Sequence, residues 1–244
     1  MKLVIAVLLS FVYYLFFILI LLFFHPVQVI AFNLFGYQVH KKVVDALNFS
    51  LIHNLSLLFC RTTFQGLENI PTGKPIIIIA NHQSMYDISP IGWAFRKHHP
   101  KFISKKELGK YLPSISYNLQ KGGSVLIDRE SSMQSIKEIF KLGNFIERNN
   151  YSVCLFPEGT RSRDGKVKNF QSGGFRTLLK AAPSALVVPF VIDGNYRLHK
   201  YGFPLNIGLS LKYIVLKPIS RGDMSVDDFL QIIEEKIKVT LSGK

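Results

Sequence analysis

The sequence has little cysteine and no nucleophile-elbow motif, and each absence argues against a class of protein. Only Cys60 and Cys154 occur among the 244 residues, in no CxxC or Cys/His spacing. A zinc site and a disulfide-stabilised secreted domain are therefore not indicated. The sequence contains no GxSxG motif, so an acyl-serine mechanism lacks its usual signal.

Acidic residues are also scarce, and this leaves two strongly basic stretches. The chain has 16 Asp and Glu against 30 Lys and Arg, a formal net charge of +14. In residues 96–121 the only acid is Glu107, and in residues 161–180 it is Asp164. Such stretches attract anionic membranes, phosphate-bearing substrates or nucleic acid. We do not expect nucleic-acid binding, because the sequence has no base-stacking aromatic module.

A long apolar segment opens the chain. Leu3–Phe24 carries no charged side chain, and as a helix its 22 residues would extend about 33 Å, enough to cross the core of a bilayer. A cleaved signal peptide has a shorter apolar region and a small-residue cleavage site. We expect a membrane-embedded helix that closes at His25-Pro26 and either crosses the bilayer or dips into one leaflet.

The residues on either side of this helix predict its orientation in the membrane and the role of the segment that follows. Lys2 alone precedes the helix and Lys41-Lys42 follows it, so the positive-inside rule places the globular part on the cytoplasmic side of the cell membrane. Residues 43–60 carry apolar side chains at spacings of three and four, which is typical of an amphipathic helix. This helix either lies in the membrane interface or covers the domain core. We assign residues 1–60 to membrane anchoring.

Residues 61–244 are predicted to form one α/β domain. Ile76–Ala80 is typical of a strand buried on both faces. Helical patterns begin near Ser131, after Gly173-Gly174, and at Ser225. Strands that alternate with helices indicate a mostly parallel, mixed sheet flanked by helices. The further runs of strand type are Lys101–Ser104, Ser124–Ile127, Ser152–Phe156, Ala185–Val191 and Leu209–Leu216.

A histidine and an aspartate follow the first of these strands. Ile76–Ala80 runs directly into NHQSMYD, so His82 stands at the carboxyl edge of the sheet, where α/β sites form. His82 and Asp87 can meet only if Asp87 lies in the first helical turn, with Ser84 as the N-cap. Asp87 would then fix the imidazole tautomer and leave the other ring nitrogen to take a proton. The alternative is a plain capping box beside a loop histidine.

A second polar turn follows another predicted strand. The sequence FPEGTRS occupies residues 156–162, and its proline, acid, glycine and arginine make a poor core. Such a turn presents backbone N–H groups and the guanidinium of Arg161 toward an anion. Taken alone, the same sequence also fits an ordinary turn with a solvated arginine.

Four motifs in this order resemble those of the glycerolipid acyltransferase family, and above all its 1-acyl-sn-glycerol-3-phosphate acyltransferase branch. The resemblance covers roughly residues 60–220. The motifs are NHQSMYD, GSVLIDR at residues 123–129, FPEGTRS, and VVPF at residues 187–190. The sequence departs from the family pattern at Leu126, Ser116 and Gln171-Ser172, none of which touches the HxxxxD core.

The resemblance implies a role for particular residues. His82 is expected to be the catalytic base and Asp87 the partner that orients it. A further set is expected to bind the acceptor, with Arg161 gripping its phosphate: Lys105, Arg129, Glu158, Gly159, Thr160 and Arg161.

The resemblance also implies a reaction. We expect a fatty acyl group to pass from acyl-CoA or acyl-carrier protein to the sn-2 hydroxyl of lysophosphatidic acid, giving phosphatidic acid at a phospholipid membrane. The transfer would be direct and need no metal or bound cofactor. Alternatives are another acceptor, such as a lyso-ornithine lipid, or a non-catalytic lipid-binding relative. The intact His82, Asp87 and Arg161 argue against the last.

Overall fold

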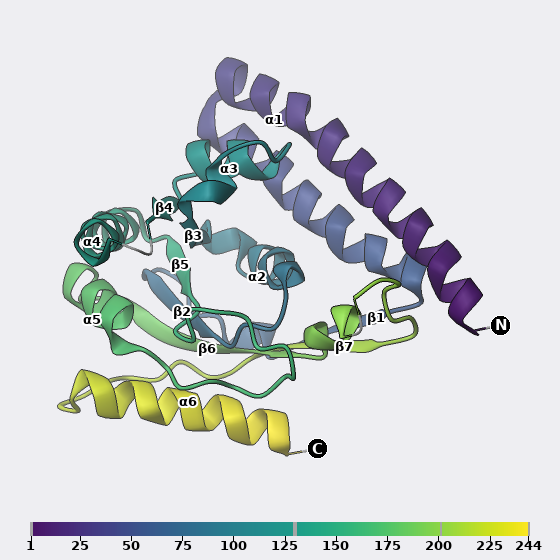
Figure 1. Cartoon of the computed structure of the whole chain (residues 1–244). Coiled ribbons are helices and arrows are strands. Elements are labelled where there is room, and N and C mark those ends of the chain that lie inside the picture. Colours follow the sequence, from purple (N-terminus) through teal and green to yellow (C-terminus); the bar gives the residue numbers. More distant parts are fainter. Residues whose placement is uncertain (1, 129–130, 201, 244) are drawn as a thin grey trace.

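One mixed sheet forms the centre of the protein. The computed structural model describes residues 2–128, 131–200 and 202–243, and within them seven strands pair in the order β1-β7-β6-β2-β5-β3-β4 (Figure 1). Every neighbouring pair is parallel except β6 with β7, so the predicted mostly parallel, mixed sheet is confirmed. The strands are β1 (Arg61–Gln65), β2 (Ile76–Ala80), β3 (Lys101–Lys105), β4 (Val125–Ile127), β5 (Ser152–Leu155), β6 (Leu186–Asp193) and β7 (Ser210–Val215).

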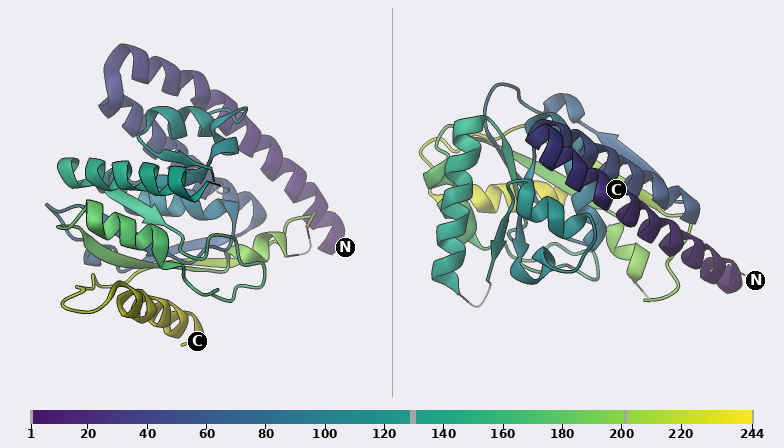
Figure 2. Two further views of the ribbon diagram at one scale, coloured as in Figure 1. Left: turned by 60° about the vertical axis from the view of Figure 1, so that its left-hand side comes forward. Right: turned by 90° about the horizontal axis from the view of Figure 1, so that it is seen from above.

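Helices cover both faces of this sheet (Figures 1 and 2). The α-helices of the described residues are α1 (Lys2–Asn54), α2 (Ile88–Ala94), α3 (Ile115–Lys121), α4 (Ser132–Asn149), α5 (Ser172–Ala181) and α6 (Val226–Ser242). Short 3₁₀ turns are η1 (Leu55–Leu58), η2 (Leu67–Asn69), η3 (Met85–Asp87), η4 (Arg96–His98), η5 (Lys106–Gly109) and η6 (Asn195–His199). The helices α4 and α6 begin where the sequence predicts, because Ser131 and Ser225 accept hydrogen bonds from backbone N–H groups of their first turns.

The central strand β2 shows why two helical layers are needed. Ile76 and Ile78 pack into a core with α2, η1 and Tyr13 of α1, whereas Ile77 and Ile79 pack into a second core with α4, α5 and α6. All four isoleucines are fully buried. Successive side chains of a strand point to opposite faces, so a continuous apolar run is stable only when both faces are covered.

The long helix α1 is a hairpin of two arms. Its first arm continues past His25-Pro26, so the prediction that the helix closes there is wrong. Proline has no backbone N–H and so removes one helical hydrogen bond. Ser114, which lies outside the helix, stabilises the turn beside Pro26. Its Oγ donates to the carbonyl of Leu21 at 2.7 Å, and its backbone N–H donates to Nδ1 of His25 at 3.1 Å. The chain reverses instead at Gly36, where φ is +77° and a side chain would be strained.

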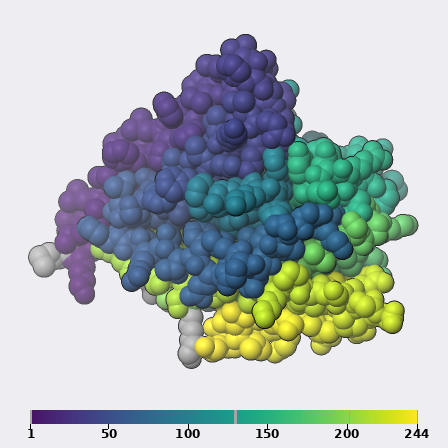
Figure 3. Space-filling model, turned by 180° about the vertical axis from the view of Figure 1, so that it is seen from behind, coloured from purple at the N-terminus to yellow at the C-terminus, as the bar shows by residue number. Residues whose placement is uncertain are grey.

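Both arms are built into the globular core. Tyr13 of the first arm is fully buried, and its carbonyl accepts a hydrogen bond from Asn54 of the second arm at 3.2 Å. Ser10 Oγ accepts from the backbone N–H of Leu205 at 2.9 Å. The second arm and η1 bury Leu47 and Leu58, so the predicted amphipathic helix covers the domain core. Seen from behind, α1 and the segment after it form one continuous surface (Figure 3).

Candidate active site

The predicted site residues gather along the carboxyl edge of neighbouring parallel strands. His82 follows β2, and Glu158 to Arg161 follow β5, which pairs with β2 up to Ile79 and Leu155. Lys105 ends β3, the other neighbour of β5. The strand β4 leads to Arg129, which lies outside the described residues. The sheet therefore brings together the turns that carry His82, Arg161 and Lys105.

The centre of this row is an imidazole–carboxylate pair. His82 Nδ1 lies 2.7 Å from Oδ2 of Asp87, and Asp87 is fully buried while the side chain of His82 is 14% exposed. The same oxygen accepts from the backbone N–H groups of Gln83 at 2.7 Å and Ser84 at 2.9 Å. A buried carboxylate is stable only when such donors compensate its lost hydration.

The pairing and the capping box are both present, so they are not alternatives. Ser84 is the N-cap of η3, and its Oγ accepts from the N–H of Tyr86 at 3.4 Å. In the other half of the capping box, Asp87 Oδ2 accepts from the N–H of Ser84. This short 3₁₀ turn brings Asp87 back toward His82. A regular helix between residues 82 and 87 would instead point the two side chains apart.

Two polar residues that the sequence did not single out support the pair. Asn195 Nδ2 donates to Oδ1 of Asp87 at 2.7 Å, and Asn195 Oδ1 accepts from the hydroxyl of Tyr213 at 2.9 Å. Asn81 joins the end of β2 to β6 by bonding both N–H and C=O of Ile192, at 2.8 and 2.9 Å. Asn195 lies four residues after the predicted strand Ala185–Val191, so the sequence could have placed it near the sheet edge but not against Asp87.

The FPEGTRS turn holds the backbone of His82 from two sides. Glu158 is buried and accepts from the N–H of His82 at 2.7 Å and from the N–H of Lys168 at 3.0 Å. The carbonyl of His82 accepts from the N–H of Ser162 at 2.7 Å. Burial raises the pKa of Glu158, and its two N–H donors oppose that rise. The structure thus gives Glu158 a positioning role; its contact with substrate stays a prediction.

Gly159, Thr160 and Arg161 of the turn face solvent. Gly159 has φ +67°, Thr160 Oγ1 and the carbonyl of Arg161 both accept from Nζ of Lys168, and the side chains of Thr160 and Arg161 are exposed. Lys105 is exposed as well. An exposed guanidinium and ammonium at one sheet edge suit a phosphate ligand.

The geometry of His82 supports proton transfer. Since Nδ1 is bound to Asp87, Nε2 is the ring nitrogen left to exchange a proton with a substrate. The ring stacks on Phe156 with centroids 4.1 Å apart, which fixes its orientation. Among the described residues, no group of three His, Cys, Asp or Glu side chains could hold a metal ion.

Comparison with known proteins agrees with this geometry. The family model described as "Acyltransferase" matches residues 61–193, more than half of the chain. The chain belongs to the acyltransferase family. It is 31% identical over 186 residues to a chloroplastic 1-acyl-sn-glycerol-3-phosphate acyltransferase of Brassica napus, covering 74% of this chain and 52% of that protein. It is also 31% identical over 183 residues to the Saccharomyces cerevisiae 1-acyl-sn-glycerol-3-phosphate acyltransferase, covering 72% of this chain and 58% of the relative.

A solved acyltransferase structure extends the likeness to the whole fold. The 1-acyl-sn-glycerophosphate (LPA) acyltransferase PlsC from Thermotoga maritima superposes with a TM-score of 0.83 at 25% identity, covering 100% of this chain and 97% of that one. By contrast, the chain spans about half the length of the two curated relatives above.

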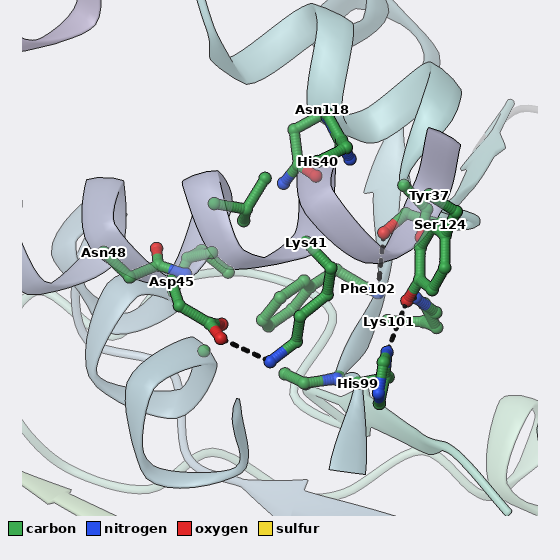
Figure 4. A pocket seen from close by; sticks show the side chains of 15 residues that line it. Tyr37, His40, Lys41, Asp45, Asn48, His99, Lys101, Phe102, Asn118 and Ser124 are labelled. Carbon is green, nitrogen blue, oxygen red and sulfur yellow. Dashed lines mark hydrogen bonds and ion pairs between the residues drawn. The ribbon is translucent and has the colours of Figure 1, made fainter. Parts of the chain in front are cut away.

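A small cavity is lined by residues of α1, β3 and α3 (Figure 4). Its volume is about 40 Å³, and it lies between the second arm of α1 and the start of β3. Lys101 is buried there, donates to the hydroxyl of Tyr37 at 2.6 Å and the carbonyl of Gly122 at 2.7 Å, and burial lowers its pKa to about 7. Lys101 begins β3 and Lys105 ends it, so the cavity lies at the opposite end of this strand from Lys105. It belongs to the contact between the hairpin α1 and the sheet.

Substitutions at His82 and Asp87 separate proton transfer from helix capping. We expect His82→Ala to lower kcat by about 10²–10⁴-fold, the usual contribution of a general base. Asp87→Asn should lower kcat less, because an amide oxygen still caps the helix but does not stabilise an imidazolium. The measurement is kcat of purified protein in detergent, with the thermal midpoint as a folding check and His53→Ala, an exposed histidine of α1, as the control.

Near wild-type turnover in His82→Ala would contradict general-base catalysis by this residue. An Asp87→Asn protein with a lower midpoint and full specific activity would show that Asp87 serves only the capping box.

Proposed function

We propose that this protein transfers a fatty acyl group from a thioester donor to the sn-2 hydroxyl of lysophosphatidic acid, giving phosphatidic acid. The observation that carries the proposal is the oriented His82–Asp87 pair, whose free Nε2 lies on the same sheet edge as Arg161 and Lys105. The printed activities of the curated relatives and of the Thermotoga maritima protein support the acceptor.

The proposed reaction uses Nε2 of His82 as the base. Nε2 takes the proton of the acceptor hydroxyl as the oxygen attacks the thioester carbonyl, and Asp87 stabilises the imidazolium that forms. Collapse of the tetrahedral intermediate breaks the carbon–sulfur bond. The imidazolium returns its proton to the departing thiolate, so His82 ends in its starting state.

The acyl donor is proposed to be acyl-CoA or acyl-carrier protein. Both present a thioester and a phosphorylated or acidic carrier, which suits the basic stretches at residues 96–121 and 161–180. The mechanism needs no metal or resident cofactor, because the histidine supplies both proton transfers.

We further propose that α1 holds the enzyme on one leaflet of the cell membrane, with the catalytic domain on the cytoplasmic side. The helix is long and apolar enough to cross a bilayer. However, Ser10, Tyr13 and Leu21 bind the globular core along one side of the first arm, and only the opposite side is exposed. A helix that keeps these contacts meets lipid with its outer face alone, as an interfacial anchor does.

An acceptor panel tests the proposed substrate. We expect lysophosphatidic acid to be acylated far faster than monoacylglycerol, which lacks the phosphate, or a lyso-ornithine lipid. Arg161→Lys should raise the KM for lysophosphatidic acid about tenfold, because lysine does not reproduce the bidentate fork, and should leave the KM for the acyl donor nearly unchanged. Equal rates on all acceptors, or equal effects of Arg161→Lys on both substrates, would contradict the assignment.

The membrane proposal is tested on the outer face of the first arm. Leu15, Leu19 and Leu22 are exposed and lie on one side of the helix. Changing all three to serine should weaken partition onto lipid vesicles at least about tenfold, since each buried leucine contributes roughly 1.5–3 kcal/mol. Activity should fall more on bilayer-embedded acceptor than on a monomeric short-chain acceptor.

A matched control removes three exposed apolar side chains from another helix. Met133, Ile136 and Phe140 form an exposed stripe on α4, and their triple serine variant should bind vesicles as the wild type does. Equal vesicle binding by all three proteins would overturn anchoring by the first arm. Deletion of residues 1–60 is a poorer test, because it removes Tyr13 and Leu58 from the core.

A further inference from the structure

A short segment after β3 exposes apolar and basic side chains beside the first arm of α1. Residues 106–112 comprise the turn η5 and the three residues that follow it. Tyr111 is 94% exposed, and Leu108 and Leu112 are each more than a third exposed. Three apolar side chains exposed within five residues form a patch rather than scattered single residues. Such patches mark interaction surfaces.

The backbone holds Tyr111 in this exposed position. Its φ is +67° and that of Ser114 is +61°, in the left-handed region that residues other than glycine seldom adopt. The fully buried Ser114 keeps the turn in place, because its N–H and its hydroxyl bind His25 and Leu21 of the first arm. Bonds to α1 therefore support a strained turn that leaves a large aromatic ring in solvent.

The 106–112 segment and the first arm border the same surface. Tyr111 of the segment, His25 of the arm and Tyr117 of α3 line one hollow of about 400 Å³. The rings of His25 and Tyr117 have centroids 6.0 Å apart. Leu22 and Phe23 of the arm are exposed close to this point. Figure 1 shows α3 beside α1, so the exposed apolar groups of the arm and of the segment are neighbours.

The charge of the 106–112 segment is positive. Lys106 and Lys110 are exposed, and Glu107 is its only acid. Within the described residues, neither lysine belongs to an ion pair. Lysines beside a bilayer bind anionic headgroups, and tyrosine rings are enriched at the membrane–water interface. The combination of lysines with exposed apolar tips next to the arm suits an anionic lipid surface.

This inference rests on the proposed function, because it extends the membrane anchor beyond α1. We propose that the 106–112 segment is a second membrane contact, in which Tyr111 and Leu112 enter the headgroup region and Lys106 and Lys110 bind anionic lipid phosphates. A single helix on a surface is free to roll about its axis, whereas a second contact beside it fixes the rotation. Lys105, at the end of β3, is then held at the depth of the headgroup phosphates.

A single fluorescent label measures where Tyr111 lies. Cys60 and Cys154 are both buried, so a thiol-reactive nitrobenzoxadiazole dye labels Tyr111→Cys selectively in the full chain. Val239→Cys is the control, because Val239 is exposed on α6, on the opposite face of the sheet from α1 (Figure 1). On vesicles of phosphatidylcholine mixed with phosphatidylglycerol, we expect the emission to shift to the blue at position 111 and to stay unchanged at position 239.

Vesicle binding by charge and apolar variants tests the two parts of the contact separately. Lys106→Gln with Lys110→Gln should weaken binding to the mixed vesicles by about 10- to 25-fold, since each lysine near an anionic surface contributes about fivefold. Its effect on pure phosphatidylcholine vesicles should be small. Tyr111→Ser with Leu112→Ser should weaken binding to both kinds of vesicle at least about fivefold.

Matched controls make the same changes elsewhere on the surface, with the thermal midpoint as a folding check. These variants should bind vesicles as the wild type does: Lys217→Gln with Lys236→Gln, and Ile232→Ser with Val239→Ser.

Several results would overturn the second contact. One is an unshifted emission at position 111, and another is wild-type vesicle binding by both variants of the segment. A raised KM for acyl-carrier protein in the lysine variant, with unchanged vesicle binding, would mean that the lysines dock an acidic donor instead. The first-arm variant at Leu15, Leu19 and Leu22 separates the failures. If it alone loses binding, the anchor stands and only the second contact is wrong; if it also binds as the wild type does, the proposed anchor is wrong.

Discussion

The structure depends on one buried carboxylate that four donors hold in place. Asp87 accepts from His82, from two backbone N–H groups of its own turn, and from Asn195 on the neighbouring strand end. A fully buried charge without these bonds would destabilise the fold by several kcal/mol. The same bonds that make Asp87 stable therefore orient the His82 ring, so the fold and the proposed catalytic base depend on one interaction.

The parallel sheet delivers the remaining groups to that point. The strands β2, β5, β3 and β6 end at one edge, and each adds a group there: the His82–Asp87 pair, the FPEGTRS turn with Glu158 and Arg161, Lys105, and the Asn195–His199 segment. The hairpin α1 is packed into the same core through Tyr13 and Ser10. Under the proposed function, an acceptor that left the bilayer along the first arm would arrive at the turns that carry Arg161, Lys105 and His82.

Much of the sheet and the contact between His82 and Asp87 could be predicted from the sequence, because β2 is a continuous apolar run and the HxxxxD spacing brings the two side chains together only around an N-cap. Strand β1 was missed because RTTFQ is polar and lies at the sheet edge, where burial leaves little pattern. The end of the first arm was misplaced because Ser114, far along the chain, stabilises the turn at Pro26. Asn195 and the positioning role of Glu158 depend on pairing between distant strands, which one sequence does not encode locally.

In the proposed mechanism Asp87 holds Nδ1 of His82 protonated and leaves Nε2 as the free base. Nitrogen-15 NMR of histidine-labelled protein in detergent micelles, with the His82 signals assigned by their loss in His82→Ala, measures this directly. We expect a protonated Nδ1 and an unprotonated Nε2 at neutral pH, with the pattern lost or mixed in Asp87→Ala. A His82 ring that carries its proton on Nε2 in the wild-type protein would contradict it.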